Sequence, residues 1–193
     1  MFDREDLETK KRASALAQSQ DVELRRQALE FVVQSDKYGY AYQWTWLGLP
    51  IIQLPADIVA VQEIIWQTQP DLIIETGVAW GGSVVLYASL MQLYGRGQVV
   101  GVDLNLHEHV AQSIMSYPFS HRIHLYKGSS TDPDVFARVR THSDSSQRVM
   151  VILDSDHTEG LATNHVRIPW TLDCGRTLVS DVAELAFKRG RKT

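Results

Sequence analysis

The segment 73–83 has the composition of a ligand-binding turn. It reads Ile-Ile-Glu-Thr-Gly-Val-Ala-Trp-Gly-Gly-Ser, an apolar run followed by closely spaced glycines. Glycine lets the backbone turn sharply and approach a ligand, and a helix that begins at such a turn presents free N–H groups to it. The sequence therefore predicts a cofactor site at this turn, with Gly77 and Gly81 among the residues that shape it.

Two acidic residues indicate which cofactor fits the turn. Gly77 and Gly81 are four residues apart, which differs from the G-x-G-x-x-G spacing of dinucleotide-binding proteins. The carboxylate of Glu75 would repel a pyrophosphate but would attract the cationic amino end of S-adenosylmethionine. Asp103, 26 residues after Gly77, ends a second apolar run, where a carboxylate usually accepts the ribose hydroxyls of a nucleoside. A helix cap or a surface acid is the alternative interpretation of Asp103.

Polar residues also follow the later apolar runs. Ser129, in the segment 128–132, would lie near an adenine edge, although a capped loop before a helix would explain the same residues. Asp154 and Asp181 each end an apolar run, and two converging carboxylates suit a hard cation such as Mg²⁺. His157 could take a proton from a substrate hydroxyl near neutral pH. A cap or a surface position is the alternative for this histidine.

The pattern of apolar residues predicts the elements that position these side chains. Residues 3–34 are polar, contain no Gly or Pro and predict a helix, and residues 38–54 predict an irregular aromatic segment. Strands and helices then alternate, with strands over 71–75, 98–102, 122–126, 148–153 and 176–181, and helices over 56–69, 83–94, 109–116 and 133–141. Because the strands read as unbroken Val, Ile and Leu runs, we expect a Rossmann-like α/β fold, a parallel sheet with helices on both faces.

This alternation also predicts the domain organisation. We expect an N-terminal helical extension over residues 1–38 and a cofactor-binding α/β domain over residues 39–193. Ligands in open α/β sheets bind beyond the carboxyl ends of the strands, which is where the polar residues fall. The extension would pack on the domain or on a second subunit, so we expect a homo-oligomer.

Composition excludes several classes of protein. A chain of 193 residues with 44% hydrophobic and 22% charged residues suits one globular α/β domain. The formal net charge of −4 argues against a general nucleic-acid-binding protein. One cysteine, Cys174, excludes an intrachain disulfide and a Cys-rich metal site. No apolar run approaches the ~20 residues needed to cross a membrane, and the acidic N-terminus does not resemble a signal peptide. We therefore expect a cytoplasmic protein.

Six separate blocks of the sequence resemble one known family. The blocks are residues 45–57, 70–77, 101–103, 120–123, 128–132 and 152–157, and together they cover about residues 40–160. They look like the cephalosporin hydroxylase family, whose members have the fold of class I S-adenosylmethionine methyltransferases. The relatives of that family include metal-dependent sugar O-methyltransferases of macrolide and rhamnosyl antibiotic pathways.

The resemblance implies roles for individual residues. It implies cofactor contacts at Glu75, Gly77, Ser83, Asp103 and Ser129. It also implies a Mg²⁺ site that uses Asp154 and the acids ending the next strand, and it places His157 where related sugar methyltransferases have their catalytic base.

Three departures from the family pattern bear on the metal site and on the end of the sheet. The family usually ends its fifth strand with an adjacent Glu-Asp pair, whereas this chain has Ser180-Asp181, and one carboxylate fewer should weaken a cation site. Residues 158–176 are shorter and less similar than expected. The chain stops at Thr193, which leaves no obvious room for the last two strands of such a sheet, so a partner subunit could cover the exposed edge.

Three functions stay open on this evidence. The leading one is methyl transfer from S-adenosylmethionine to a hydroxyl of a small molecule, such as a glycosylated secondary metabolite, with help from Mg²⁺. The second takes the family name literally, as a β-lactam hydroxylase, but the sequence does not offer the two His and one carboxylate of non-haem iron oxygenases. The third is a catalytically impaired relative that binds cofactor or forms oligomers, which Ser180 and the short C-terminal part favour.

Overall fold

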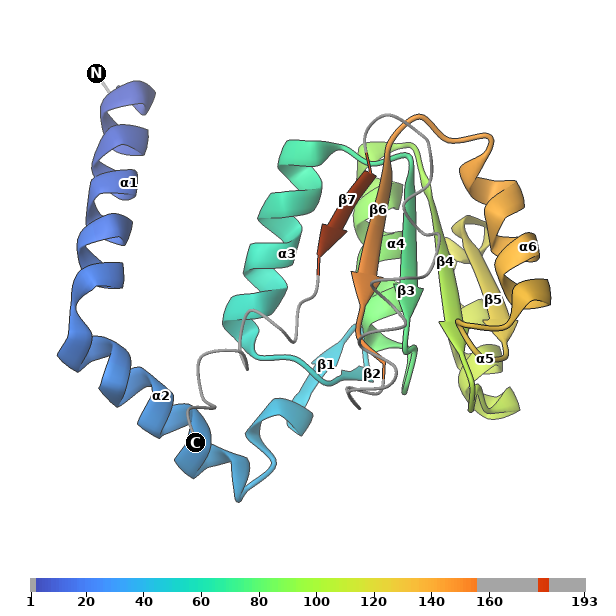
Figure 1. Cartoon of the computed structure of the whole chain (residues 1–193), viewed down its shortest axis with the longest axis horizontal. Helices are drawn as coiled ribbons and strands as arrows, with labels where there is room; N and C mark the ends of the chain where they lie inside the picture. Colours follow the sequence, from blue (N-terminus) through green and yellow to red (C-terminus); the bar gives the residue numbers. More distant parts are fainter. Residues whose placement is uncertain (1–2, 156–176, 181–193) are drawn as a thin grey trace. The chain divides into compact units, whose positions relative to one another are not determined.

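The computed structural model describes residues 3–155 and, as strand β7, Thr177–Ser180. The chain divides into two compact units, Met1–Ala41 and Tyr42–Thr193, whose elements are labelled in Figure 1. None of the helices described combines the length and the apolar character that crossing a membrane requires.

The first unit contains two helices where one was predicted. Helix α1 spans Arg4–Gln20 and helix α2 spans Val22–Asp36, and between them Asp21 has an extended backbone with φ −73° and ψ 100°. The N–H of Leu24 donates to the Asp21 carboxylate at 2.9 Å. The expectation of one continuous helix over residues 3–34 is therefore wrong, because Asp21 caps the start of a new helix instead of continuing the old one.

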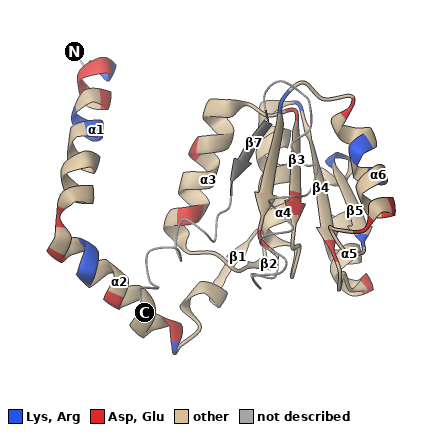
Figure 2. Cartoon of the chain, viewed as in Figure 1, with Lys and Arg blue, Asp and Glu red and all other residues tan. Residues whose placement is uncertain are grey.

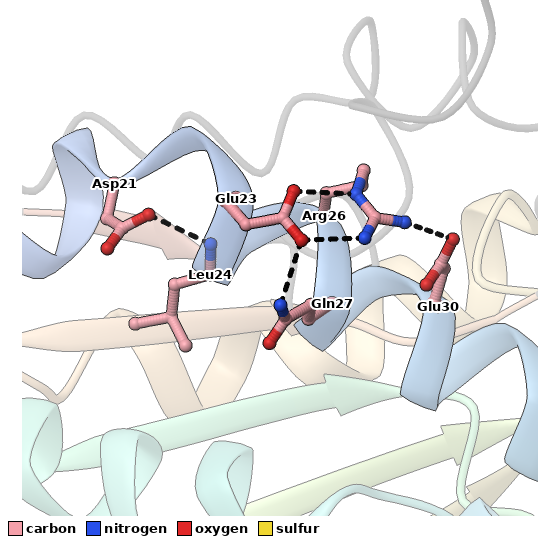
Figure 3. Close-up of polar contacts among 6 residues, drawn as sticks. All are labelled: Asp21, Glu23, Leu24, Arg26, Gln27 and Glu30. Atoms are coloured by element: carbon pink, nitrogen blue, oxygen red, sulfur yellow. Dashed lines mark hydrogen bonds and ion pairs between the residues drawn. The ribbon is translucent and has the colours of Figure 1, made fainter.

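Ionic contacts run along α2. Arg26 forms hydrogen-bonded ion pairs with Glu23 and Glu30, which lie about one turn away on either side (Figure 3). Hydrogen bonds from Arg26 and from Gln27 lower the pKa of Glu23 to about 2. Lys and Arg residues of α1, α2 and α6 are interspersed with acidic residues of the same helices (Figure 2).

A short antiparallel hairpin begins the second unit, after the 3₁₀ turn Tyr40–Tyr42. Strand β1 spans Trp44–Trp46, strand β2 spans Leu49–Ile51, and Thr45 is the register partner of Pro50. The two residues between the strands, Leu47 and Gly48, have φ of 48° and 94°. Positive φ at both positions is the geometry of a tight hairpin turn. The prediction of an irregular segment over 38–54 is therefore wrong for these residues.

The predicted alternation of strands and helices is confirmed in the second unit. Its further elements are α3 (Pro55–Thr68), β3 (Leu72–Thr76), α4 (Gly82–Tyr94), β4 (Gln98–Asp103), α5 (Glu108–Met115), the 3₁₀ turn Ser120–Arg122, β5 (Ile123–Lys127), α6 (Pro133–Ser143), β6 (Val149–Leu153) and β7 (Thr177–Ser180). Pro55 and Pro133 each stand at the start of a helix, where the missing N–H costs nothing.

The five longer strands form one parallel sheet in the order β5-β4-β3-β6-β7. The chain moves outward from β3 through β4 to β5, then returns to the other side of β3 for β6 and β7. The order therefore reverses between β3 and β6. In open α/β sheets the ligand crevice lies at the carboxyl end of the strands at this reversal.

Side chains on both faces of the sheet are buried, as the apolar runs predicted. On one face Ile73 packs in a cluster with residues of α3, α4 and α5, and on the other Leu72 and Ile74 pack with Val135 and Val139 of α6. Figure 1 shows α3 and α6 on either side of the strands. Burial on both faces fixes the register of β3, and with it the position of the residues that follow this strand.

Candidate functional site

Backbone hydrogen bonds join the carboxyl ends of four strands. The N–H of Asp154 donates to the carbonyl of Thr76 at 2.9 Å, that of Gly77 to Val102 at 2.8 Å, and that of Gly128 to Asp103 at 3.0 Å. These bonds continue the pairing of β6, β3, β4 and β5 by one residue beyond the strands. The predicted site residues at the four strand ends are therefore held along one edge of the sheet.

The turn after β3 requires glycine at two positions for reasons of space. Gly77 and Gly81 have φ of 95° and 87°, which L side chains rarely adopt. A Cβ on Gly77 would lie 2.1 Å from the carbonyl oxygen of Asp154, and a Cβ on Gly81 would lie 2.5 Å from Cδ1 of Ile114. Gly77 thus permits the close approach of the β3 and β6 ends, while Gly81 permits the packing of α5.

Asp103 fastens this turn to the end of β4. Oδ2 of Asp103 accepts the backbone N–H of Val78 at 2.8 Å and that of Ala79 at 2.9 Å, and Oδ1 accepts the N–H of Asn105 at 2.7 Å. A carboxylate has about four lone-pair sites, so these three bonds leave room for about one more donor. Asp103 can therefore shape the turn and still accept a ligand hydroxyl.

The joined strand ends border a cavity, the first pocket, of about 340 Å³. It is lined by Thr76, Gly77, Ala79, Val102, Asp103, Leu104, Asn105, Gly128, Ser129, Ser130, Asp154 and Ser155. This lining brings together the predicted cofactor residues Gly77, Asp103 and Ser129. The volume falls within the range of small-molecule sites.

The loop that contributes Ser129 is ordered by local bonds. The Ser129 hydroxyl accepts the backbone N–H of Thr131 at 3.2 Å and shares a 2.7 Å hydrogen bond with the Thr131 hydroxyl. Asp132 caps α6 by accepting the N–H groups of Asp134 and Val135. The capped-loop interpretation is thus correct for Asp132, and Ser129 nevertheless lines the pocket.

A second pocket of about 240 Å³ lies on the other side of the glycine turn. It is lined by Pro50, Ile51, Ile52, Gln53, Gly77, Val78, Ala79, Trp80, Gly82, Ser83, Asp154 and Ser155. Four of these residues, Gly77, Ala79, Asp154 and Ser155, also line the first pocket. The two pockets are therefore contiguous around the turn and Asp154.

Glu75 lies behind the wall of the second pocket. Its side chain is fully buried, and its Oε2 accepts the hydroxyl of Ser83 at 2.9 Å. Burial raises the pKa of Glu75 well above its ordinary value, and the nearby charges of Asp154 and Asp103 act in the same direction. Side-chain hydrogen bonding with Ser83 and with Tyr87 opposes the shift. Of these two predicted cofactor residues, Ser83 lines the pocket and Glu75 lines neither pocket described here.

Two polar residues that sequence reasoning missed lie beside Glu75. Gln53 is 5% exposed and Tyr87 is fully buried. Burial raises the pKa of the Tyr87 phenol, as does the charge of Glu75, and side-chain hydrogen bonding with Gln53 opposes the shift. The available signal was a glutamine within the apolar run 51–54, because a polar residue in such a run must be buried with a partner or face a ligand.

The structure describes only part of the predicted metal and catalytic set. Asp154 follows β6 and lines both pockets. The second predicted metal ligand, Asp181, and the predicted base, His157, lie outside the described residues. Within residues 3–155 no three His, Cys, Asp or Glu side chains gather in a way that could hold a metal ion.

Comparison with known proteins links this site to one family. A family model described as "Rhamnosyl O-methyltransferase/CmcI" matches residues 38–171. The rhamnosyl O-methyltransferase of Mycobacterium tuberculosis (strain ATCC 25618 / H37Rv) is 32% identical over 124 residues, which is 63% of this chain and 47% of that protein. The rhamnosyl O-methyltransferase of Mycobacterium leprae (strain TN) is 28% identical over 116 residues, 59% of this chain and 48% of that protein. The chain spans about half the length of these relatives.

Solved structures show the same fold. A CmcI apo structure has 23% sequence identity and a TM-score of 0.55, over 77% of this chain and 61% of that one. A CmcI structure described as Mg-SAM has 21% identity and a TM-score of 0.55, over 77% and 62% of the two chains. These likenesses confirm the predicted class I methyltransferase fold. The match over residues 38–171 confirms the resemblance seen in the sequence, and the chain belongs to the rhamnosyl O-methyltransferase/CmcI family.

Proposed function

We propose that this chain binds S-adenosylmethionine at the carboxyl edge of the sheet and transfers its methyl group to a hydroxyl of a small molecule. The observation that carries the proposal is the bond between Asp103 and the glycine turn. Through this bond the carboxylate of Asp103 and the turn lie in the wall of one pocket, and Asp154 lines the same pocket. Membership of a family named for O-methyltransferases supports the reaction class.

The first pocket would take the adenosine half of the cofactor. Asp103 would accept a ribose hydroxyl with its remaining lone pair. Ser129, which follows β5, would lie beside the adenine, and Gly77, which has no side chain, would let the ligand approach the backbone of the turn. A pocket of this kind binds a nucleoside by shape and by a few polar groups.

The acceptor and metal half would lie around Asp154. Asp154 and Asp181 would hold Mg²⁺, and carboxylates at strand ends are the donors that this hard cation prefers. When bound, the ion supplies positive charge that lowers the pKa of a coordinated hydroxyl. His157 would take the hydroxyl proton, and the rigid strand ends would keep the acceptor in line with the methyl group.

The identity of the acceptor rests on the relatives. Two of them are named rhamnosyl O-methyltransferases, which supports a sugar hydroxyl, or another hydroxyl of a secondary metabolite, as the methyl acceptor. We also propose that the protein is a cytoplasmic homo-oligomer. The formal net charge of −4 does not favour a nucleic-acid substrate.

Calorimetric titration with S-adenosylmethionine, with and without Mg²⁺, tests the proposal. We expect binding in both conditions, and methyl transfer to a sugar-bearing acceptor that depends on Mg²⁺ and on Asp154. An absence of binding at millimolar cofactor would reject the proposed function. Binding that is indifferent to both Mg²⁺ and Asp154→Ala, with no transfer, would instead identify a catalytically impaired cofactor-binding protein.

A further inference from the structure

Trp80 is a large aromatic side chain that is half exposed at the candidate site. It stands in the turn after β3, with 51% of its surface exposed, and it lines the second pocket. Single apolar side chains are common on protein surfaces, so exposure alone indicates no function. An aromatic ring that also borders a pocket is different, because a ligand that enters the pocket can cover the face of the ring.

The backbone of the turn fixes where Trp80 projects. Ala79 has a φ of 47°, in the left-handed region that residues other than glycine rarely adopt, and its N–H donates to the Asp103 carboxylate at 2.9 Å. Val78, which precedes Ala79, is 1% exposed, whereas Trp80 is 51% exposed. The turn therefore buries Val78 and presents Trp80 from a backbone that is already ordered, which keeps the entropic cost of binding a ligand low.

The lining of the second pocket is both apolar and polar. Its polar residues include Asp154, beside which the acceptor hydroxyl is proposed to lie. Its larger apolar residues come from the turn, from β2 and from the residue after β2, and they are Pro50, Ile51, Ile52, Val78 and Trp80. A ligand that contacts both kinds of residue needs an apolar face and a polar edge.

A sugar ring has both kinds of surface, because its hydroxyls lie around the edge and its C–H groups lie on the faces. These C–H groups carry a small positive charge, which the electron-rich face of an indole attracts. We propose that Trp80 is an acceptor-binding residue, and that a sugar ring lies on its indole while one hydroxyl of the sugar faces Asp154. This inference rests on the proposed function, and it names the residue that would favour a ring-shaped acceptor over a linear alcohol.

The adenine of the cofactor is the other flat group that could stack on an indole. Adenine is proposed to lie in the first pocket, beside Ser129, and Trp80 does not line that pocket. The two pockets meet at Gly77 and Asp154. A cofactor bound in the first pocket would therefore present its methyl group near Asp154, and the acceptor would reach it from the side of Trp80. Changes at Trp80 should affect the acceptor and not the nucleoside.

Titration of the full chain with methyl α-L-rhamnopyranoside, in the presence of saturating S-adenosylhomocysteine, tests the role of Trp80. We expect Trp80→Ala to weaken binding of the sugar by about tenfold, and Trp80→Phe, which keeps an aromatic face, by about threefold or less. Affinity for S-adenosylhomocysteine should stay unchanged in both variants. Trp66→Ala is the matched control, because Trp66 is 59% exposed on α3 and lines neither pocket described here. Saturation-transfer NMR measures the weak binding of the sugar.

Tryptophan fluorescence shows whether the sugar contacts Trp80 itself. The sugar should change the emission of the wild type and of Trp66→Phe, but not that of Trp80→Phe. A change that persists in Trp80→Phe would overturn the inference, as would a parallel loss of S-adenosylhomocysteine binding or a Tm lowered by several degrees in Trp80→Ala. A wild-type chain that binds S-adenosylhomocysteine but not the sugar would overturn this inference alone. A chain that binds neither would reject the proposed function first, and this inference with it.

Discussion

The backbone N–H of Val78 donates a 2.8 Å hydrogen bond to the carboxylate of Asp103, and this bond ties the turn after β3 to the end of β4. The acid that was expected to contact ribose is therefore also the acid that shapes the glycine turn. Its oxygens already accept three backbone N–H groups. Cofactor binding and the conformation of the turn should consequently respond together to changes at this residue.

Replacing Asp103 by Asn should weaken cofactor binding by about 10–100-fold, because an amide NH₂ would face backbone N–H donors where a carboxylate oxygen now accepts them. Titration with S-adenosylmethionine measures the loss. Asp132→Asn is the matched control, since Asp132 caps α6 on the same edge and Asn caps a helix equally well. Equal affinity in the two variants would contradict the role assigned to Asp103.

Two glycines allow the energetic cost of a positive φ to be separated from the cost of a steric clash. Gly48 and Gly77 have nearly the same φ, 94° and 95°, but a Cβ on Gly48 meets nothing within 4 Å whereas one on Gly77 meets the Asp154 carbonyl at 2.1 Å. We expect Gly48→Ala to cost about 1–2 kcal/mol in the free energy of unfolding. Gly77→Ala should cost about 4 kcal/mol or more. Urea unfolding measures both, and equal costs would show that the β3 and β6 ends can move apart.

The main features of the sheet could be predicted because they depend on short stretches of sequence. The run from Leu72 to Ile74 is buried on both faces, so its composition alone indicated a central parallel strand. Because the carboxyl ends of parallel strands lie at one edge of a sheet, Asp103 and Asp154 were expected on that edge. Neither inference needed knowledge of a contact between distant residues.

The missed features depend on local geometry or on tertiary contacts. The hairpin turn uses Leu47 and Gly48 rather than the Asn-Gly pair that signals such turns, and Asp21 interrupts a helical pattern by a single capping bond. The burial of Gln53 beside Tyr87 arises from what surrounds it in the folded chain. The hydrogen bond between Glu75 and Ser83 also depends on tertiary packing, and the cofactor contact expected of Glu75 stays a prediction.

Two histidines should make the protein less stable in mild acid. Burial lowers the pKa of His124 below 6.5, and burial followed by the proximity of His124 lowers that of His142. Their rings lie 4.4 Å apart, centroid to centroid. A histidine whose pKa is lower in the folded chain than in the unfolded chain contributes its full stabilisation above the unfolded pKa of about 6.5. This contribution to the free energy of unfolding is lost as the pH falls through about 6.5 toward the folded pKa.

Thermal unfolding between pH 7.5 and 5 measures this loss. We expect the Tm of His124→Gln to fall less over this interval than that of the wild type, since one of the two protonation sites is gone. His121→Gln, at an exposed position one residue before Arg122, serves as the control. A pH dependence that is identical in all three proteins would show that the pair does not govern acid stability.

His157 is the predicted base, and its replacement by Ala should lower the rate of methyl transfer by about 10²–10⁴-fold. Affinity for S-adenosylmethionine should stay unchanged, because the base contacts the acceptor rather than the cofactor. His109→Ala, on α5, is a control that should retain the wild-type rate. Turnover by His157→Ala at the wild-type rate would remove His157 from the mechanism.

Glu75 should destabilise the folded chain increasingly as pH rises. Burial and the charges of Asp154 and Asp103 raise the pKa of Glu75 well above 4.5. Between the unfolded and the folded pKa the folded state keeps a proton that the unfolded state has released, so the free energy of unfolding falls with rising pH. Glu75→Gln keeps the shape of the protonated acid and removes this titration.

The free energy of unfolding of Glu75→Gln relative to the wild type should therefore increase from pH 5 to pH 8, with a slope of up to about 1.4 kcal/mol per pH unit. Urea unfolding at four pH values measures it, and Glu108→Gln, at an exposed position of α5, gives the baseline. A difference that is constant with pH would mean that the folded chain holds Glu75 ionised. In that case the ionised carboxylate of Glu75 would be available to pair with a cofactor ammonium. Because bound ammonium would favour the ionised form, adding S-adenosylmethionine should reduce the slope only if Glu75 pairs with that group.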